Sequence, residues 1–319
     1  MSPPLRRIWL RVPRISPETY RGITLLAAIA LGFIIVTGGA VRLTGSGLGC
    51  PDWPTCARHH VVAPVEYHAM VEFVNRVVTG AVSVLVVVAV LGALVREPRR
   101  RDLTWLAGGL VAGVVGQIVL GGLAVLEKLA PPFVMAHFLL SLALLCDAVV
   151  LHYRAGETVG PARLLVDRWH LALSRALVVL TTVAVFLGTV VTSTGPHGGD
   201  PKAPRFHFSL HRVAQLHGGA VTALLALTLY LAWSLRRAGA PAAVQARLRA
   251  LVQIMVLQAG VGYLQYFTGV PVFLVGIHVA GAASVWAGVV WFHAGLASRS
   301  PSGAPATVTV SVQPALAGT

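Results

Sequence analysis

Charged residues are scarce in this chain of 319 residues. They make up 11% of the sequence, whereas a soluble domain usually carries about 25%. Hydrophobic residues make up 56%. So apolar a composition excludes a water-soluble globular enzyme, and it also excludes a disordered chain.

Acidic residues are the scarcer of the two charge types, with 11 against 25 basic residues and a formal net charge of +14. Such an excess of basic residues can indicate a nucleic-acid partner. Here, however, the basic residues lie in short segments between long apolar runs, where membrane topology explains them. We therefore expect a lipid bilayer, and no nucleic acid, as the environment of this protein.

The apolar runs show no alternation with a period of two, which excludes a membrane β-barrel. A helix needs about 20 mostly apolar residues to cross a bilayer. Eight stretches are long enough to predict an all-α integral membrane protein with eight transmembrane helices. They are Ile23–Val41, Val71–Val95, Leu103–Leu126, Pro132–Leu151, Leu171–Thr192, Leu210–Leu235, Leu251–Phe267 and Val270–Ala297.

Most basic residues lie in alternate connections, on one predicted side of the membrane. The positive-inside rule assigns this side, and with it both termini, to the cytoplasm. The residues concerned are Arg6, Arg7, Arg11, Arg14, Arg21, Arg96, Arg99, Arg100, Arg101, Arg154, Arg163, Arg168, Arg175, Arg236, Arg237, Arg247, Arg249 and Arg299.

The two halves of the chain share a pattern. Gln117 in the third predicted helix precedes His137 by 20 residues, and Gln258 in the seventh precedes His278 by the same distance. We expect a four-helix unit duplicated in tandem, with both copies in the same orientation because each has an even number of helices. The predicted parts are a basic N-terminus (1–22), an N-terminal half (23–152), a cytoplasmic linker (153–170), a C-terminal half (171–297) and a disordered tail (298–319).

Three histidines, His137, His217 and His278, lie in the outer parts of predicted spans, where polar residues are costly and usually functional. Two histidines on facing helices can ligate a haem iron inside a bundle. The alternative is that they form hydrogen bonds between helices. Small residues beside them would let a flat macrocycle approach the backbone; they are Gly218, Gly219, Gly276, Ala280 and Gly281.

The partner of His278 has two candidates. His217 precedes His278 by 61 residues, much as Asn75 precedes His137 by 62, whereas the dipeptide His211–Arg212 resembles Asn75–Arg76. Six residues on a helix rotate by about 600°, so His211 and His217 cannot share a face. The spacing favours His217, with His211 as the alternative ligand.

Two acidic residues, Glu72 and Asp147, fall inside predicted spans. Glu72 shares a helix face with His68 and Asn75 and could handle protons beside a haem. The alternative is an ion pair with Arg76, four residues on. For Asp147, on the cytoplasmic side, we expect a buried pair or a helix cap.

Cysteines are few, and no C-x-x-C-H motif is present, which excludes covalent attachment of a c-type haem. Cys50 and Cys56 bracket five residues with two prolines in the first external loop, where disulfides persist. The alternatives are a closed disulfide loop and a pair of free thiols.

The segment from Thr44 to Cys56, TGSGLGCPDWPTC, is followed by EFVNR from Glu72 to Arg76 and by the three histidines. Across about Ile23–Ala297, these motifs resemble the haem A synthase family, and the composition resembles its actinobacterial branch. The external TGSG…CPDWP…C segment is the most specific part of the resemblance.

The resemblance implies an enzyme of the bacterial plasma membrane that oxidises the C8 methyl group of haem O to the formyl group of haem A through successive hydroxylations. It implies a haem b cofactor between His217 and His278 in the C-terminal half. Substrate haem O would lie in the N-terminal half, with Glu72 needed for activity. Cys50 and Cys56 would form a disulfide in an outside loop.

One position departs from the family pattern. Many members have a histidine where this chain has Asn75, and asparagine is a poor iron ligand. The substrate haem would then have His137 as its ligand, or His68 after rearrangement. An iron with one open face suits a haem that must react and leave.

The resemblance also implies haem O synthase and cytochrome oxidase assembly as partners, and the sequence does not decide between a monomer and a homo-oligomer. A non-enzymatic membrane carrier of b-type haems is the alternative function. A transporter is disfavoured, because the spans show no charged path through the midplane.

Overall fold

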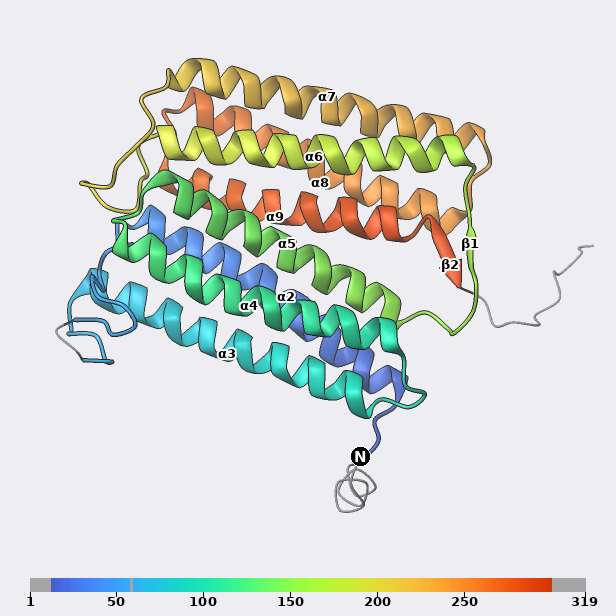
Figure 1. The fold of residues 1–319 in the computed structure, drawn as a ribbon. Coiled ribbons are helices and arrows are strands. Elements are labelled where there is room, and N and C mark those ends of the chain that lie inside the picture. The colour runs from blue at the N-terminus through green and yellow to red at the C-terminus, as the bar shows by residue number, and fades with distance from the viewer. Residues whose placement is uncertain (1–12, 58–59, 300–319) are drawn as a thin grey trace, which may run out of the picture.

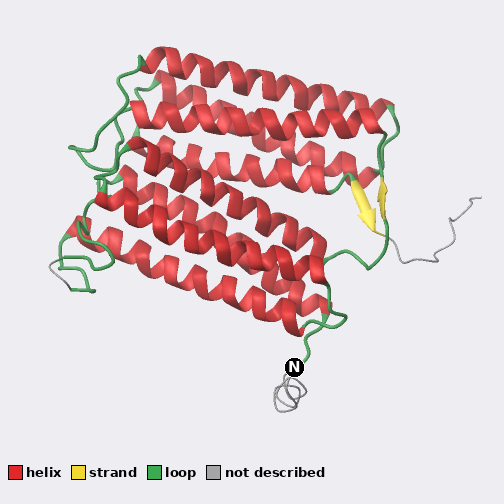
Figure 2. Cartoon of the chain, viewed as in Figure 1, coloured by secondary structure: helices red, strands yellow, loops and turns green. Residues whose placement is uncertain are grey.

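The computed structural model describes residues 13–57 and 60–299, and within them eight long α-helices lie side by side (Figure 1). Each helix is long and apolar enough to cross a membrane, as the sequence predicted. Loops join the helices at the two ends of the bundle, and one pair of short strands lies at one end (Figure 2). The helices are α2 (Pro17–Leu43), α3 (Tyr67–Val95), α4 (Arg101–Leu126), α5 (Pro131–Ala155), α6 (Arg168–Thr194), α7 (Leu210–Arg237), α8 (Ala242–Phe267) and α9 (Val272–Ala294).

Seven of the helices are longer than the apolar runs that predicted them, whereas α9 begins two residues later and ends three residues earlier than its run. The largest difference is in α8, which begins at Ala242 although its apolar run begins at Leu251. Arg247 and Arg249, predicted to lie in a connection, therefore lie in the first turns of this helix. A helix of 26 residues is about 39 Å long, whereas the hydrocarbon core is about 30 Å thick, so charged residues can occupy helical turns beyond the core.

Local signals explain where several helices start. The Oγ atom of Ser16 accepts a hydrogen bond of 3.1 Å from the backbone N–H of Thr19 at the start of α2. The carboxylate of Asp167 accepts one of 2.9 Å from the N–H of His170 at the start of α6. These side chains satisfy N–H groups that have no partner within the first helical turn.

Each half of the chain forms a ring of four contacting helices. In the first half α2 packs on α3 and α5, and α4 packs on α3 and α5; in the second half α6 packs on α7 and α9, and α8 packs on α7 and α9. The halves meet where α9 contacts α2 and α5. Buried residues of α9 belong to both hydrophobic clusters, with Ala283 and Val290 in the first and Val289 and Phe292 in the second.

The two ends of the bundle differ in the connections that they carry. The connections that follow α2, α4, α6 and α8 lie at one end, which we call the loop end (Figure 1). The opposite end carries the start of α2, the three basic connections and the end of the described chain (Figure 1). The basic connections are therefore grouped as predicted, while the assignment of this end to the cytoplasm stays a prediction.

Two strands of three residues, β1 (Ala162–Leu164) and β2 (Ala297–Arg299), join the predicted linker to the end of the second half. They pair antiparallel, and the hydroxyl of Tyr153 donates to the backbone oxygen of Ala297 at 3.0 Å. The linker thus contains a strand, and the first two residues of the predicted disordered tail, 298 and 299, belong to β2. Residues 300–319 of that tail and residues 1–12 of the basic N-terminus lie outside the described residues.

Candidate functional site

Two histidine rings face each other between α7 and α9. The ring centroids of His217 and His278 are 6.3 Å apart, and the ring planes are inclined by 75°. Nδ1 of His217 donates to the backbone oxygen of Ala184 at 2.9 Å, and Nδ1 of His278 lies 3.0 Å from Nε2 of Gln258. Each ring is therefore anchored through Nδ1. His217, which donates through Nδ1, has the arrangement of imidazoles that bind a metal through Nε2, whereas Nδ1 of His278 accepts from the amide of Gln258.

The distance between these rings is compatible with two imidazoles that bind one haem iron. Metal–imidazole bonds of about 2 Å would place the centroids of two opposed rings about 6 Å apart. Glycines make room for the rings, since a Cβ atom on Gly188 or Gly262 would lie 3.1 Å from Cε1 of His217 or His278, respectively. Beside His217, a Cβ on Gly218 or Gly219 would meet no atom within 4 Å.

Two glycines next to His278 lie against other side chains. A Cβ atom on Gly276 would contact the side chain of Leu43 in α2, and one on Gly281 would collide with the side chain of Gln258. Both glycines thus face neighbouring side chains, whereas Gly218 and Gly219 face open space. Which of these residues a macrocycle would approach stays a prediction.

His211 does not approach His278. Its side chain is exposed, and its Nδ1 atom lies 2.8 Å from the hydroxyl of Tyr266. The structure brings His217 against His278 instead, as the spacing favoured.

In the first half, His137 of α5 has surroundings similar to those of His278. A Cβ on Gly121 would lie 3.3 Å from Cε1 of His137, and Gln117 Nε2 donates to the backbone oxygen of His137 at 3.1 Å. Nδ1 of His137 and Oδ1 of Asn75 are buried and have no hydrogen-bond partner among the described residues. Two buried polar atoms without partners are an arrangement that a ligand can complete.

Glu72 is buried and fully engaged. Its Oε2 atom accepts the backbone N–H of Cys50 at 2.8 Å, and its Oε1 atom pairs with Nη2 of Arg76 at 2.7 Å. The alternative of an ion pair with Arg76 is thus present in the structure. The carboxylate also contacts the Cys50–Cys56 loop, which the sequence did not indicate.

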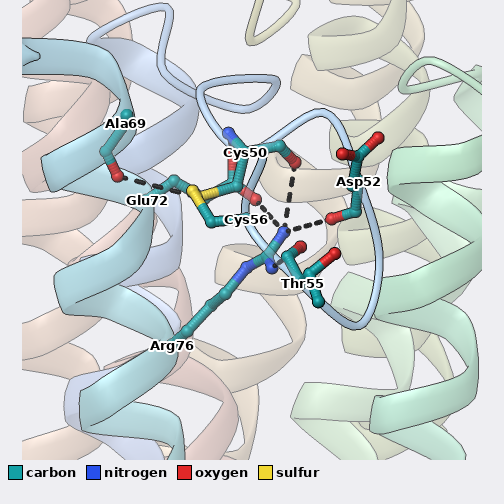
Figure 3. Close-up of a disulfide and its surroundings, with 7 residues drawn as sticks. All are labelled: Cys50, Asp52, Thr55, Cys56, Ala69, Glu72 and Arg76. Carbon is teal, nitrogen blue, oxygen red and sulfur yellow. Dashed lines mark hydrogen bonds and ion pairs between the residues drawn. A yellow bond between two sulfur atoms is a disulfide. The ribbon is translucent and has the colours of Figure 1, made fainter. Parts of the chain in front are cut away.

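Cys50 and Cys56 form a disulfide, with an S–S distance of 1.99 Å. Both residues have no exposed surface. The loop that they close lies against the first turns of α3 near Glu72 and Arg76 (Figure 3).

The TGSG segment that precedes this loop positions His68. The Oγ atom of Ser46 lies 2.9 Å from Nδ1 of His68. Gly45 has a φ of +69°, which glycine adopts at little cost. Gly49 passes so close to the backbone of His68 and Ala69 that no Cβ atom would fit.

Comparisons with known proteins show the family of this chain. A family model described as cytochrome oxidase assembly protein (COX15-CtaA) matches residues 21–196. The chain belongs to the haem A synthase (COX15/CtaA) family.

Relatives of the family extend the similarity to most of the chain. The haem A synthase of Listeria monocytogenes serotype 4a (strain HCC23) is 28% identical over 298 residues, which are 88% of this chain and 95% of the relative. That of Listeria welshimeri is also 28% identical over 298 residues, with the same shares of the two chains. The haem A synthase of Geobacillus kaustophilus is 32% identical over 119 residues, which are 36% of this chain and 35% of the relative.

In this member of the family, Asp147 does not behave as predicted. Its Oδ1 atom is buried without a hydrogen-bond partner among the described residues. Arg154 pairs with Asp102 and Glu157 instead, at 3.5 and 3.7 Å. The expected buried pair or cap was wrong, because Asp147 points across to Gly109 of α4.

Sequence reasoning missed a link between the two halves at the loop end. Nε of Arg42, in the last turn of α2, donates to the oxygen of His197 at 2.7 Å, and Nη2 donates to the oxygen of Thr192 at 3.0 Å. The N–H of Gly47 donates to the oxygen of Gly199 at 2.9 Å. An arginine next to the carbonyl end of another helix is stabilised by the helix dipole, but its partner depends on packing that the sequence does not display.

Proposed function

We propose that this chain, as a haem A synthase, is a membrane oxidoreductase that oxidises the C8 methyl group of haem O to a formyl group by successive hydroxylations. The product, haem A, would serve the assembly of cytochrome oxidase. The observation that carries the proposal is the facing pair His217 and His278 in a chain of this family.

The C-terminal half would hold a b-type haem, with His217 and His278 as axial ligands. The anchored Nδ1 atoms, the centroid distance of 6.3 Å and the glycines beside the rings support this assignment. A haem with two histidine ligands transfers electrons. Ala184 and Gln258 would hold the two rings in place, and the bound haem would supply electron transfer.

The N-terminal half would bind haem O as substrate, with His137 and Asn75 beside it. The buried atoms Nδ1 of His137 and Oδ1 of Asn75, which have no partner in the described part of the chain, support a ligand there. An asparagine in place of a second histidine would leave one face of the substrate iron without a protein ligand. That asymmetry suits a haem that is exchanged after turnover.

Glu72 would act on protons at the substrate side. It lies one helical turn before Asn75, and its two oxygens are held by the N–H of Cys50 and by Arg76. A carboxylate held in a fixed orientation can accept or deliver a proton without first reorganising.

The topology follows from the same proposal. The two halves would be tandem copies of one four-helix unit, supported by the similar surroundings of His137 and His278 and by the two rings of helices. In the bacterial plasma membrane the basic end would face the cytoplasm, and the Cys50–Cys56 loop would face outside. There it could receive haem O from its synthase and pass haem A to cytochrome oxidase assembly.

The test is haem identification in the purified protein after co-expression with a haem O synthase. Pyridine-haemochrome spectra and chromatography should detect haem A or its hydroxylated precursor beside haem B. Haem B alone, with haem O available, would contradict the oxidation and would favour a carrier. A protein without haem would contradict both assignments.

A further inference from the structure

Four oxygens surround the guanidinium of Arg76. Its Nη2 atom donates to Oε1 of Glu72 at 2.7 Å and to the backbone oxygens of Cys50 and Asp52 at 3.2 and 3.4 Å. Its Nη1 atom donates to the backbone oxygen of Thr55 at 2.9 Å. Figure 3 shows the side chain extending from α3 toward the inner face of the disulfide loop, where these carbonyl groups converge.

An arginine side chain suits these four acceptor oxygens better than a lysine side chain does. A loop closed by Cys50 and Cys56 has little regular backbone pairing, so its inward carbonyl groups require donors from elsewhere. The planar guanidinium offers several N–H groups in a fixed fork and can serve a carboxylate and separate carbonyls together, whereas a lysine ammonium is a single compact point of charge.

Glu72 links Cys50 and Arg76 into a closed set of hydrogen bonds. One of its oxygens binds Arg76, and the other accepts the N–H of Cys50, the residue whose carbonyl group Arg76 also binds. Sγ of Cys50 lies 3.8 Å from the oxygen of Ala69, one helical turn before Glu72. The loop and the carboxylate therefore share one set of hydrogen bonds, and neither can move alone.

The far side of the loop rests on the neighbouring helix. A Cβ atom on Gly122 of α4 would lie 2.9 Å from the ring of Trp53, so only a glycine lets this ring pack so closely. The loop thus bridges α3, where Arg76 binds it, and α4, where Trp53 rests.

We propose that Arg76 is a positioning residue that locks the disulfide loop and the Glu72 carboxylate together. Its effect on the reaction rests on the proposed function, whereas its hold on the loop does not. Both sulfurs are buried, so a reductant reaches the disulfide only after the loop lifts from α3. Lifting requires the Arg76 hydrogen bonds to break.

The first measurement is the rate of disulfide reduction in the full-length protein in detergent. Arg76→Lys keeps the charge but loses the fork, and Arg212→Lys, at the exposed start of α7, is the matched control. After timed exposure to a phosphine reductant, maleimide labelling and mass analysis distinguish one thiol, Cys146, from three.

We expect Arg76→Lys to be reduced about tenfold faster than wild type, the factor carried by one charge-assisted hydrogen bond, and the control to match wild type. Equal rates for all three proteins would overturn the proposal.

The second measurement is haem O conversion by the same proteins, with haem B content as the check on folding. Arg76→Lys should lower kcat about tenfold and keep KM within about twofold, as expected when a group is misoriented and substrate binding is kept. Faster reduction with an unchanged kcat would show a held loop and would refute the positioning of Glu72. If the wild-type protein converts no haem O, the proposed function fails, and the reduction rates still decide whether Arg76 holds the loop.

Discussion

At the scale of single residues, glycines determine how much room each imidazole has. A Cβ atom on Gly262 would lie 3.1 Å from Cε1 of His278, whereas one on Gly260 in the same helix would meet nothing within 4 Å. Gly262→Ala should therefore displace the ring and weaken retention of haem B about tenfold, since overpacking costs about 1–3 kcal/mol. Haem B per protein after detergent washing measures this. Gly260→Ala should match wild type, and equal loss in both variants would contradict the explanation.

The two candidate partners of His278 can be separated by substitution. His217→Ala and His278→Ala should each abolish retained haem B, because one ligand alone leaves the iron exchangeable. His211→Ala should retain it, because His211 is exposed and contacts Tyr266. Pyridine-haemochrome spectra of the three purified variants decide. Loss of haem B from the His211 variant alone would reverse the assignment.

Glu72 can be changed while its contact with the Cys50 N–H is kept and its ion pair with Arg76 is lost. In Glu72→Gln the amide oxygen can still accept the N–H of Cys50, while the ability to exchange a proton is lost. We expect conversion of haem O to fall about a hundredfold or more, with unchanged haem B content. Chromatographic measurement of haem A formation tests this expectation. Full conversion would leave Glu72 a structural ion-pair residue.

Residue-scale prediction from sequence worked where a motif repeats. Gln117 with His137 and Gln258 with His278 share a spacing, and each pair proves to be in contact. It failed for Asp147, because the direction of a side chain around a helix does not reveal what the neighbouring helix places opposite it. The carbonyl of Ala184 was missed for the same reason.

The spacing between the two halves also identifies Gly188 as a candidate site residue. The segments VRLTG around Thr44 and VTSTG around Thr194 are similar in sequence and lie 150 residues apart. The same separation pairs Gly38 with Gly188. Gly188 lies beside His217. A residue-by-residue alignment of the halves would therefore have added it to the candidate site.

At the scale of elements, α6 offers a test of helix capping. The backbone N–H of His170 lowers the pKa of the Asp167 carboxyl. This hydrogen bond therefore stabilises the folded protein above the ordinary pKa of aspartate, and the stabilisation is lost only as the pH falls through the lowered pKa. Asp167→Ala should speed amide exchange in the first turn of α6 roughly fivefold at neutral pH. Asp167→Asn, which can still accept, should change it little. Hydrogen-exchange mass spectrometry compares the two, and equal exchange would contradict a capping role.

All eight helices could be predicted, because an apolar run of about 20 residues is a strong and local signal. The last residues of α3, α4 and α8 were predicted correctly. Other ends were not, since helical hydrogen bonds continue beyond the hydrocarbon core, as at Ala242 in α8. The strands β1 and β2 could not be predicted either. Three residues carry no periodicity, and their pairing joins positions 162–164 to 297–299.

At the scale of the whole molecule, the halves are tied at both ends, by the hydrogen bond from Tyr153 of α5 to Ala297 at the basic end and by Arg42 at the loop end. Arg42→Gln removes donors to two carbonyl groups that belong to the other half. We expect a loss of about 1.5–3 kcal/mol for such hydrogen bonds, seen as a lower thermal midpoint in detergent. Arg249→Gln, at an exposed position of α8, is the control, and equal midpoints would argue against the tie.

The shared position of α9 has a consequence for the order in which the protein is made. This helix contributes Ala283 and Val290 to the core of the first half, and its Trp286 donates to the backbone oxygen of Leu142 in α5 at 2.8 Å. Yet α9 follows the other seven described helices in the chain. The first half therefore remains incomplete until α9 has been made, and a chain cut short before Val272 lacks part of both cores rather than part of one.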